Sequence, residues 1–356
     1  MKIVVDAVCP EFGGIRTYAE HLLAQWEVVF PEDELHVLVR EGSTLPTFGH
    51  FRHAVAIGRP RVIRRPLAQT RHVRRLVREV RPDAVLSMLP STTLLHPGRP
   101  MAVVVYDLRH EMRPEQFSWV TRLMRNISYG RGYRTADGIL AISQRSLDDL
   151  HQYHPRSQRV PHAVAYLGAD HVSAWPPPST DGPAITFAHH TNKNVDLVLD
   201  AWALLSFTGE RVPPLLILGV PKSDRERLAQ GIADRQLDEL VSLAPFLPDE
   251  EFIRRMVEAE MIVFPSDFEG FGLPVAEGMQ LGKAVVIGPE RATTEVAGGH
   301  AFVMDDWSPD ALADAVRAAG SMSEQQRVAA RARGEEFTWE STIRRTREML
   351  DNLANS

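Results

Sequence analysis

The chain has 356 residues, of which 44% are hydrophobic and 24% charged, and its formal net charge is −6. These values are typical of a globular protein of about two domains and exclude a disordered, collagen-like or coiled-coil chain. The longest apolar stretches, such as Met101–Tyr106, are far shorter than the roughly 20 residues of a membrane-spanning helix. Asp6 interrupts the first apolar run too early for a secretion signal, and Cys9 is the single cysteine. We therefore expect a cytoplasmic protein without an internal disulfide.

The charge is distributed unevenly along the chain. Residues 1–170 hold 23 Lys and Arg against 17 Asp and Glu, a balance of +6. The remaining residues hold 17 against 29, a balance of −12. The first half could therefore face an anionic partner.

Short runs rich in Val and Ile alternate with helical patterns along the whole chain. The first is a buried strand over Lys2–Ala7, which is followed by an amphipathic helix over Tyr18–Val29. Continuous apolar strands separated by helices predict parallel sheets covered on both faces. The further strand candidates are Leu35–Val39, Ala84–Met88, Met101–Tyr106, Gly138–Ile142, Ala184–Ala188, Pro214–Leu218, Met261–Phe264 and Ala284–Ile287.

A proline-rich segment, Trp175–Pro183, separates two series of strands and helices. Four prolines and a glycine in it cannot continue a helix or a central strand. We interpret residues 175–183 as a linker between an acceptor-binding domain, 1–174, and a nucleotide-sugar-binding domain, 184–339. A C-terminal helix over about 340–356 is expected to pack back on the first domain. The fold class is α/β, with two doubly wound, Rossmann-like parallel-sheet domains facing a cleft.

The most informative stretch begins where the strand Met261–Phe264 ends. A glycine-containing loop, Glu269 to Leu273, precedes a helix that starts at Pro274, and Gly282 stands at the C-cap position. Free amides of Gly270, Phe271, Gly272 and Leu273 at the start of this helix would bind an anion such as a diphosphate.

Two carboxylates, Glu269 and Glu277, lie eight residues apart in this stretch. Glu269 is in the loop and Glu277 is expected in the first turn of the helix, so both could point into one site. A carboxylate accepts two hydroxyl hydrogen bonds, which suits Glu277 to a ribose diol and Glu269 to sugar hydroxyls. Alternatively, Glu277 only stabilises the helix dipole and Glu269 is a surface residue.

The string from Glu269 to Glu277 resembles the Glu-x7-Glu motif of retaining, nucleotide-sugar-dependent glycosyltransferases of family 4, which have the GT-B fold. Other segments resemble the same family in the same order along the chain. They are Gly13–Tyr18, Tyr106–Leu108 with Pro114 and Glu115, Ala141–Ser146, Lys193 with Asn194, Glu295–Gly299 and Phe337–Glu340.

The resemblance implies a role for each matching residue. Glu269, Lys193 and Asp107 would be catalytic: Glu269 would orient the transferred sugar and Lys193 would neutralise the leaving diphosphate. The implied substrate-binding residues are Gly13, Gly14, Arg16, Tyr106, His110, His189, Gly270, Phe271, Gly272, Leu273 and Glu277. From the residues alone, Gly13 and Gly14 could form only a tight turn, and Lys193 could be a solvated lysine at a helix start.

Two positions depart from the family pattern. The family commonly has an arginine about five residues before the lysine, whereas Phe187–Asn192 contains none. Either His189 replaces it, or Lys222 or Arg16 supplies the second positive charge. Tyr106 stands where many members carry a histidine. His110 and the adjacent Glu111 either line the acceptor site or belong to a solvated loop.

The expected chemistry needs positive charge where the leaving group develops negative charge. No Asp-x-Asp motif for a divalent cation occurs, so we expect no metal and no cofactor beyond the nucleotide diphosphate sugar. The helix N-terminus and Lys193 could replace a metal. Retention of configuration is implied only by the resemblance.

The segment Arg59–Arg81 holds nine arginines and one acidic residue, Glu79. A helix over Gln69–Val80 would place Leu76, Val77 and Val80 on an apolar face. One interpretation is a surface for anionic lipid or a phosphorylated acceptor, with peripheral contact at the inner membrane face. The other is a solvated arginine-rich helix. The segment has no interleaved aromatic residues, so we expect no nucleic acid partner.

These observations predict a retaining glycosyltransferase that moves a hexose-like sugar from a nucleotide diphosphate sugar to an acceptor hydroxyl. The acceptor would be a saccharide, a lipid-linked precursor or a small natural product. The alternatives are a non-catalytic GT-B protein that binds nucleotide sugars and a GT-B-fold epimerase or phosphorylase. Lys283 is a poor candidate for the pyridoxal-phosphate lysine of a phosphorylase, because it follows the Gly282 cap beside a buried strand.

Overall fold

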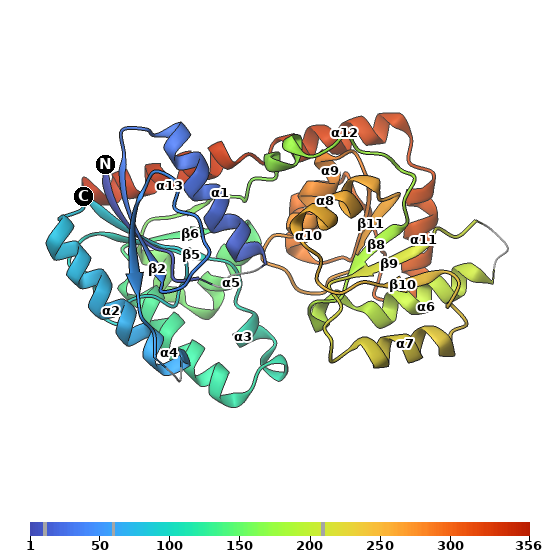
Figure 1. Cartoon of the computed structure of the whole chain (residues 1–356), viewed down its shortest axis with the longest axis horizontal. Helices are drawn as coiled ribbons and strands as arrows, with labels where there is room; N and C mark the ends of the chain where they lie inside the picture. Colours follow the sequence, from blue (N-terminus) through green and yellow to red (C-terminus); the bar gives the residue numbers. More distant parts are fainter. Residues whose placement is uncertain (10–12, 59–60, 208–210) are drawn as a thin grey trace. The chain divides into compact units, whose positions relative to one another are not determined.

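The computed structural model describes residues 1–9, 13–58, 61–207 and 211–356. The chain divides into two compact units, Met1–Gly168 with Thr338–Ser356, and Ala169–Phe337 (Figure 1). Each unit contains one entirely parallel sheet with helices on both faces, as the alternation of apolar runs and helical patterns predicts. None of the described helices is long and apolar enough to cross a membrane.

The first unit is built on a seven-stranded sheet in the order β3-β2-β1-β4-β5-β6-β7. The strands are β1 (Lys2–Asp6), β2 (Glu34–Arg40), β3 (Phe51–Val55), β4 (Ala84–Ser87), β5 (Met101–Val105), β6 (Gly138–Ala141) and β7 (His162–Val164). The helices are α1 (Gly14–Val29), α2 (Arg61–Val80), α3 (Arg109–Met112), α4 (Trp119–Thr135), α5 (Gln144–Tyr153) and α13 (Trp339–Ala354).

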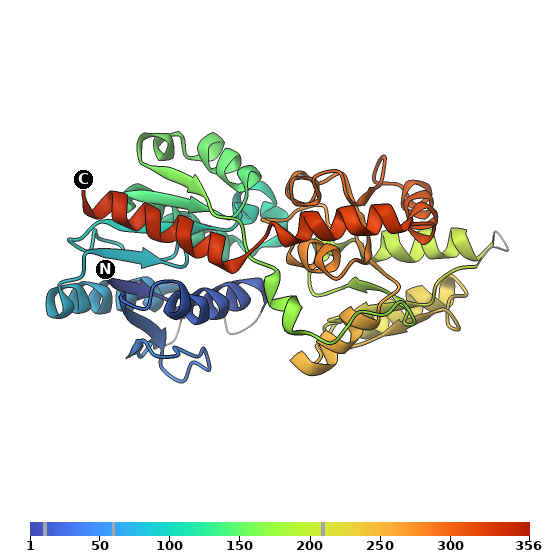
Figure 2. The ribbon, with the colours of Figure 1, turned by 90° about the horizontal axis from the view of Figure 1, so that it is seen from above.

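Helices α1 and α13 pack together on one face of this sheet, where α13 crosses β4 to β7 (Figure 2). Helices α2 and α4 contact each other and lie on the other face, against β1 and β5. The central strands are fully buried because a parallel sheet covered on both faces buries every side chain of those strands.

The second unit has a six-stranded sheet in the order β10-β9-β8-β11-β12-β13. Its strands are β8 (Ala184–Phe187), β9 (Leu215–Leu218), β10 (Val241–Leu243), β11 (Met261–Phe264), β12 (Ala284–Ile287) and β13 (Phe302–Val303). Its helices are α6 (Val195–Ser206), α7 (Arg225–Asp234), α8 (Asp249–Glu258), α9 (Leu273–Gln280), α10 (Arg291–Ala297), α11 (Pro309–Gly320) and α12 (Glu324–Glu335).

Several helices begin where the sequence supplies a cap. The Ser143 and Ser308 side chains accept hydrogen bonds from the amides of Ser146 and Ala311, at the starts of α5 and α11. Ser323 and Gln326 form a reciprocal capping box at α12. Each cap satisfies donors that the first helical turn leaves unpaired, which defines the helix start.

The segment that the sequence predicts as a linker belongs to the second unit. Ser179 and Gly182 donate backbone hydrogen bonds to Val257 and Glu258, both of 2.8 Å. The ammonium group of Lys283 also donates to the Ser179 carbonyl. The division between the units therefore lies at Gly168/Ala169 and not within residues 175–183, because these contacts fix the proline-rich segment to α8 and to Lys283, which directly precedes β12.

Candidate functional site

The residues of the predicted donor site lie on two loops of the second unit that follow neighbouring parallel strands. One loop follows β8 and contains Lys193, and the other follows β11 and contains Glu269. Two hydrogen bonds connect the loops. The Asp267 amide donates to the Asn192 carbonyl at 3.0 Å, and Asn194 Nδ2 donates to the Pro265 carbonyl at 2.9 Å. The carboxyl ends of both strands lie at one edge of the sheet, so the loops form one site.

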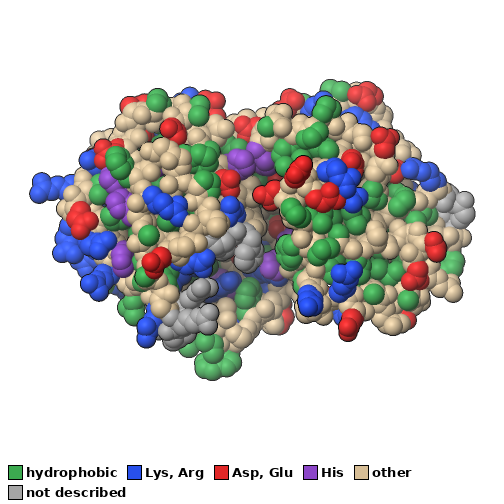
Figure 3. Space-filling model, viewed as in Figure 1, with side chains coloured by type: hydrophobic (Ala, Val, Ile, Leu, Met, Phe, Trp, Pro, Cys, Tyr) green, Lys and Arg blue, Asp and Glu red, His purple; other side chains and the backbone are tan. Residues whose placement is uncertain are grey.

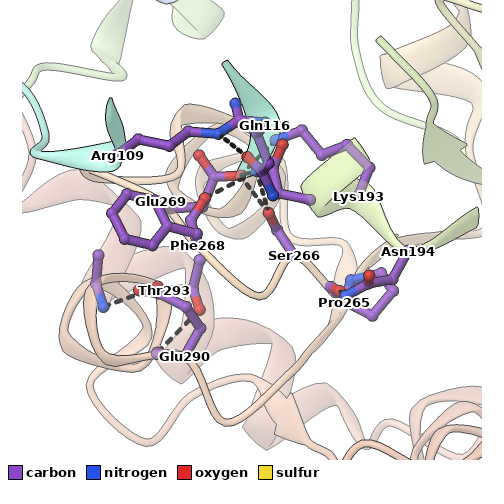
Figure 4. Close-up of polar contacts among 12 residues, drawn as sticks. Arg109, Gln116, Lys193, Asn194, Pro265, Ser266, Phe268, Glu269, Glu290 and Thr293 are labelled. Atoms are coloured by element: carbon purple, nitrogen blue, oxygen red, sulfur yellow. Dashed lines mark hydrogen bonds and ion pairs between the residues drawn. The ribbon is translucent and has the colours of Figure 1, made fainter. Parts of the chain in front are cut away.

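Three donors converge on Oε1 of Glu269 (Figure 4). Ser266 Oγ donates at 2.5 Å and Asn192 Nδ2 at 3.0 Å, and Lys193 Nζ forms an ion pair with the same oxygen. Asn192 Nδ2 also lies 2.7 Å from Ser266 Oγ and 2.8 Å from the Phe268 carbonyl. The Glu269 carboxylate is therefore held in one orientation by groups from both loops.

Two neighbouring groups stabilise the buried ammonium group of Lys193. Its side chain is only 6% exposed, and Nζ lies 4.1 Å from the centroid of the Phe264 ring, in a cation–π contact. The ring and the Glu269 carboxylate together compensate the loss of water around the ammonium group. The Lys193–Glu269 ion pair has no net charge. Positive potential for an anionic ligand would therefore have to come also from the N-terminus of α9, the adjacent helix.

Helix α9 begins directly after the Glu269 loop. Its N-cap, Gly272, has φ +96°, a left-handed conformation that glycine adopts without strain. The helix starts at Leu273, one residue before the predicted start at Pro274, which still lies in the first turn, where its missing N–H costs nothing. The amides of Gly272 and Leu273 donate no hydrogen bond to any described residue. Two unpaired amides at a helix start, beside a lysine, form an anion-binding arrangement.

Glu277 is the fifth residue of α9, which places it at the start of the second turn and not in the first. Its side chain is buried, and Oε1 accepts a hydrogen bond of 3.2 Å from His171 Nε2. The His171 ring lies edge-on to Trp175, with the ring centroids 5.6 Å apart. The carboxylate is thus oriented by a histidine of the same unit that lies far away in the sequence.

The remaining predicted residues of the second unit have different surroundings. The Phe271 side chain is buried against Phe337 with ring centroids 5.4 Å apart, so only its backbone is suited to bind a ligand. His189 follows β8 and lies edge-on to His190, at 5.0 Å between centroids. No arginine lies in this loop, so the replacement of the family arginine by His189 stays a prediction.

The glycines of the first unit stand at the start of α1. Gly13 is the N-cap with φ +74°, and its carbonyl accepts from the Arg16 and Thr17 amides at 2.8 and 3.2 Å. Arg16 Nη1 donates to Thr44 Oγ1 at 2.8 Å, and its Nε lies 3.5 Å from Glu20. Residues 10–12, which precede the predicted glycine loop Gly13–Tyr18, lie outside the described residues.

Tyr106 and Asp107 follow β5. The Tyr106 ring is buried edge-on against Tyr18, and burial raises the pKa of its hydroxyl well above the ordinary value. Asp107 Oδ1 accepts from the Arg109 amide at 2.9 Å, a contact that shapes the turn into α3. The Tyr106 hydroxyl has no hydrogen-bond partner among the described residues.

His110 is buried, which argues against the solvated-loop alternative; its place in the acceptor site stays a prediction. Its ring lies edge-on to Tyr129 at 4.9 Å, and its Nε2 is 3.4 Å from Glu111 Oε1. Glu111 Oε1 also accepts a 2.8 Å hydrogen bond from His154 Nε2. Burial alone would raise the pKa of Glu111, but the contact with His110 and the hydrogen bond from His154 outweigh it and lower this pKa to about 2.

Asn192, Ser266 and His171 were not predicted from the sequence. Ser266 precedes Glu269 by three residues and Asn192 adjoins Lys193, so their proximity along the chain was the available signal. His171 and Glu277 are 106 residues apart, and no pattern in the sequence connects them. Within the described ranges, no three His, Cys, Asp or Glu side chains are grouped so as to hold a metal ion.

The site lies within a part of the chain that matches a known protein family. Residues 184–336 match the family model "Glycosyl transferases group 1". O-antigen chain mannosyltransferase B of Escherichia coli is 28% identical over 158 residues, which are 43% of this chain and 41% of that protein.

A second curated relative is the GDP-mannose-dependent alpha-(1-6)-phosphatidylinositol dimannoside mannosyltransferase of Mycobacterium tuberculosis. It is 29% identical over 153 residues, 42% of this chain and 38% of that protein. The chain therefore spans about two fifths of the length of these relatives.

Solved structures resemble the chain over its whole length. Sucrose-phosphate synthase from Thermosynechococcus elongatus gives a TM-score of 0.76 at 15% identity, with 100% of both chains covered. Anabaena HepE, solved with UDP and glucose, gives 0.73 at 18% identity, covering 99% of this chain and 100% of the other. These likenesses and the two parallel sheets establish the GT-B fold that the sequence predicts.

Proposed function

We propose that the protein is a retaining glycosyltransferase that uses a nucleotide diphosphate sugar as donor. The observation that carries this proposal is the site after β8 and β11, where Glu269, Lys193 and two unpaired amides at the start of α9 lie together. The family match covers the residues that build this site.

In the proposed reaction, bond cleavage places negative charge on the departing nucleoside diphosphate. Lys193 and the Gly272 and Leu273 amides stabilise that charge, because fixed dipoles and a fixed cation need no reorganisation during the reaction. Glu269, oriented by Ser266 and Asn192, binds hydroxyls of the transferred sugar. The acceptor hydroxyl attacks from the side of the leaving phosphate, which takes up its proton.

The first unit supplies Asp107 as the third catalytic residue and further substrate-binding residues in this proposal. Gly13 leaves the start of α1 without a side chain, and Asp107 follows the carboxyl end of β5, where ligands of parallel sheets bind. The remaining assignments are Gly14, Arg16, Tyr106 and His110, of which His110 is the least accessible because it is buried.

The donor sugar is proposed to be a hexose, with mannose as the first candidate. Both curated relatives named above are mannosyltransferases, and one of them uses GDP-mannose. Their names include an O-antigen chain and a phosphatidylinositol dimannoside, which favours a saccharide or lipid-linked acceptor.

The test combines calorimetric titration of GDP and UDP with a donor-hydrolysis assay on GDP-mannose, UDP-glucose, UDP-galactose and UDP-N-acetylglucosamine. We expect one nucleotide to bind and its sugar conjugate to be hydrolysed slowly, and transfer to continue in the presence of a chelator. Binding without turnover under any acceptor would favour a non-catalytic nucleotide-sugar protein. Complete loss of activity with the chelator would contradict the metal-free mechanism.

Glu277→Ala should weaken binding of the preferred nucleotide by about tenfold or more, because it removes the proposed acceptor of the ribose hydroxyls. Glu324, an exposed carboxylate at the start of α12, provides the matched control Glu324→Ala. Equal affinity of the Glu277→Ala protein and the control in calorimetry would remove Glu277 from the nucleotide site.

A further inference from the structure

One surface of the first unit combines arginine side chains with exposed apolar ones. Helix α2 contains seven arginines and a single acidic residue, and α4 contains four arginines and no acidic residue. Figure 3 shows Lys and Arg side chains gathered over α2 and hydrophobic side chains projecting over α4. The structure does not describe residues 59 and 60 or the side chains of residues 61–63, so they are not counted as part of this surface.

A groove of about 760 Å³ runs along α2 and the segment 97–99. It is lined by five arginines and has Val77 in its floor. No ion pair joins any of the five to a described acidic side chain; Glu79, the one acidic residue of α2, lies 3.6 Å from Arg75 instead. We call these residues the arginine groove: Arg71, Arg74, Arg78, Arg81 and Arg99.

Helix α4 presents an apolar ridge beside this groove. Trp119, Leu123 and Ile127 follow each other at intervals of four residues, which places them on one face of the helix. They are 73%, 50% and 50% exposed. A tryptophan and two aliphatic side chains in a row, flanked by arginines and without any acid, are typical of a helix that lies in a membrane interface.

The arginine groove and the apolar ridge form one continuous surface. The segment between β4 and β5 joins them: the Leu94 amide donates to Thr70 Oγ1 of α2 at 2.8 Å, and Arg131 Nε of α4 donates to the Leu94 carbonyl at 2.8 Å. Leu95, in the same segment, is 48% exposed. Arg131 continues the row of Trp119, Leu123 and Ile127 by one further step of four residues.

We propose that this surface docks on an anionic lipid membrane, with the arginine groove binding lipid phosphates and the apolar ridge inserted among the acyl chains. Uncompensated arginines require a negatively charged partner, and adjacent exposed apolar side chains require a partner that also removes them from water. An anionic bilayer provides both over an area as wide as two helices. The proposal does not depend on glycosyl transfer, because its test measures only membrane binding.

The experiment is co-sedimentation of the full chain with vesicles of phosphatidylcholine, with and without phosphatidylglycerol. We expect binding only to the anionic vesicles, with an affinity that falls as salt is added. Arg74→Glu/Arg78→Glu should lower the partition coefficient by about 25-fold or more, since each basic residue near an anionic surface contributes about fivefold. The control Arg225→Glu/Arg331→Glu makes the same charge change at exposed positions of the second unit and should bind like the unaltered protein.

A second pair of variants tests the apolar ridge. Leu123→Ser/Ile127→Ser should weaken binding by about tenfold, because less apolar surface is removed from water. Vesicle binding should shift tryptophan emission to the blue, and this shift should shrink in Trp119→Phe. Circular dichroism and thermal unfolding verify that each variant is folded.

Three results would overturn the proposal. The first is equal binding to neutral and anionic vesicles, or no binding to either. Absence of binding would favour an acidic protein as the partner of this surface. The second is equal loss in the groove variant and its control. The third is displacement by inorganic phosphate beyond that by chloride at the same ionic strength, which would identify a site for small anions.

Discussion

At the scale of single residues, the site depends on the orientation of one carboxylate. Glu269 receives hydrogen bonds from Ser266 and Asn192 and pairs with Lys193. Groups from two loops therefore fix the position at which a sugar hydroxyl would be accepted. A carboxylate held in this way loses little conformational entropy when a ligand binds.

Glu269→Gln tests this role with little change of shape. Glutamine keeps a carbonyl oxygen for Ser266 and Asn192 but removes the negative charge, so Lys193 loses its ion pair. We expect kcat to fall about 100-fold, while KM for the donor changes less than about fivefold. Steady-state kinetics measure this, with Glu260→Gln as control, because Glu260 also pairs with a basic residue, Arg211, but outside the site. A fully active Glu269→Gln enzyme would contradict the assignment.

Glu111 provides a prediction of pH dependence. Its pKa is lowered from 4.5 to about 2, since the contact with His110 and the hydrogen bond from His154 outweigh the effect of burial. A lowered carboxyl pKa stabilises the folded state above the unfolded pKa, and that stability is lost as pH falls from about 4.5 to 2. Glu111→Gln should therefore be less stable than the unaltered protein by about 1–2 kcal/mol at pH 6, after allowance for solvent screening.

The measurement is urea unfolding of both proteins from pH 6 down to pH 3. The difference in unfolding free energy should stay nearly constant from pH 6 to about pH 5 and then shrink as the pH falls from about 4.5 towards 3. A difference that stays constant down to pH 3 would show that ionisation of Glu111 does not stabilise the fold.

At the scale of elements, α9 is held in place by α12 behind it. A Cβ added at Gly334 of α12 would lie 2.5 Å from the backbone nitrogen of Gln280 in α9. Two backbones meet at this point, so only glycine permits the observed approach. The position of Glu277 and of the amides at the start of α9 depends on this contact.

Gly334→Ala should force the two helices apart. We expect a loss of about 1–3 kcal/mol of unfolding free energy together with weaker nucleotide binding. Gly320→Ala at the end of α11 is the control, because a Cβ there meets no atom within 4 Å. Chemical unfolding and calorimetry measure both effects, and equal stability of the two variants would refute the close packing.

At the scale of the whole molecule, the chain passes from the first unit to the second and returns. Its last helix, α13, belongs to the first unit, where it packs on α1 and crosses β4 to β7. Arg347 of α13 donates from Nε to Asp33 Oδ2 at 2.6 Å, and the Asp33 side chain is fully buried. The first unit is therefore completed only by the end of the chain.

Arg347→Met should destabilise the first unit by about 1–2 kcal/mol, because Asp33 loses its guanidinium partner but keeps its ion pair with the Met1 amino group and the hydrogen bond from Trp26 Nε1. The control Arg344→Met removes an exposed arginine of the same helix that pairs with Glu340, and should cost less than about 0.5 kcal/mol. Hydrogen exchange should show faster opening of β1 and β4 to β6, with β8, β9, β11 and β12 unchanged. Uniform acceleration in both sheets would contradict the division into units.

Strands that are central in the sheets were predictable because they are continuous apolar runs. Met261–Phe264 and Ala284–Ile287 have the predicted bounds, and the other predicted strands agree with the structure to within one or two residues. The four strands that were missed are short or lie toward the edges of the sheets, where fewer buried side chains mark them. They are β3, β7, β10 and β13.

The sequence alone determined the two α/β domains and the string from Glu269 to Glu277, because apolar periodicity and helix signals act over a few neighbouring residues. Only the tertiary structure decided which distant groups meet. It joined Lys193 and Asn192 to Glu269, oriented Glu277 by His171, and placed the proline-rich segment in the second unit. Such contacts depend on the order of strands in a sheet and on loop conformation, which the packing of the whole unit selects.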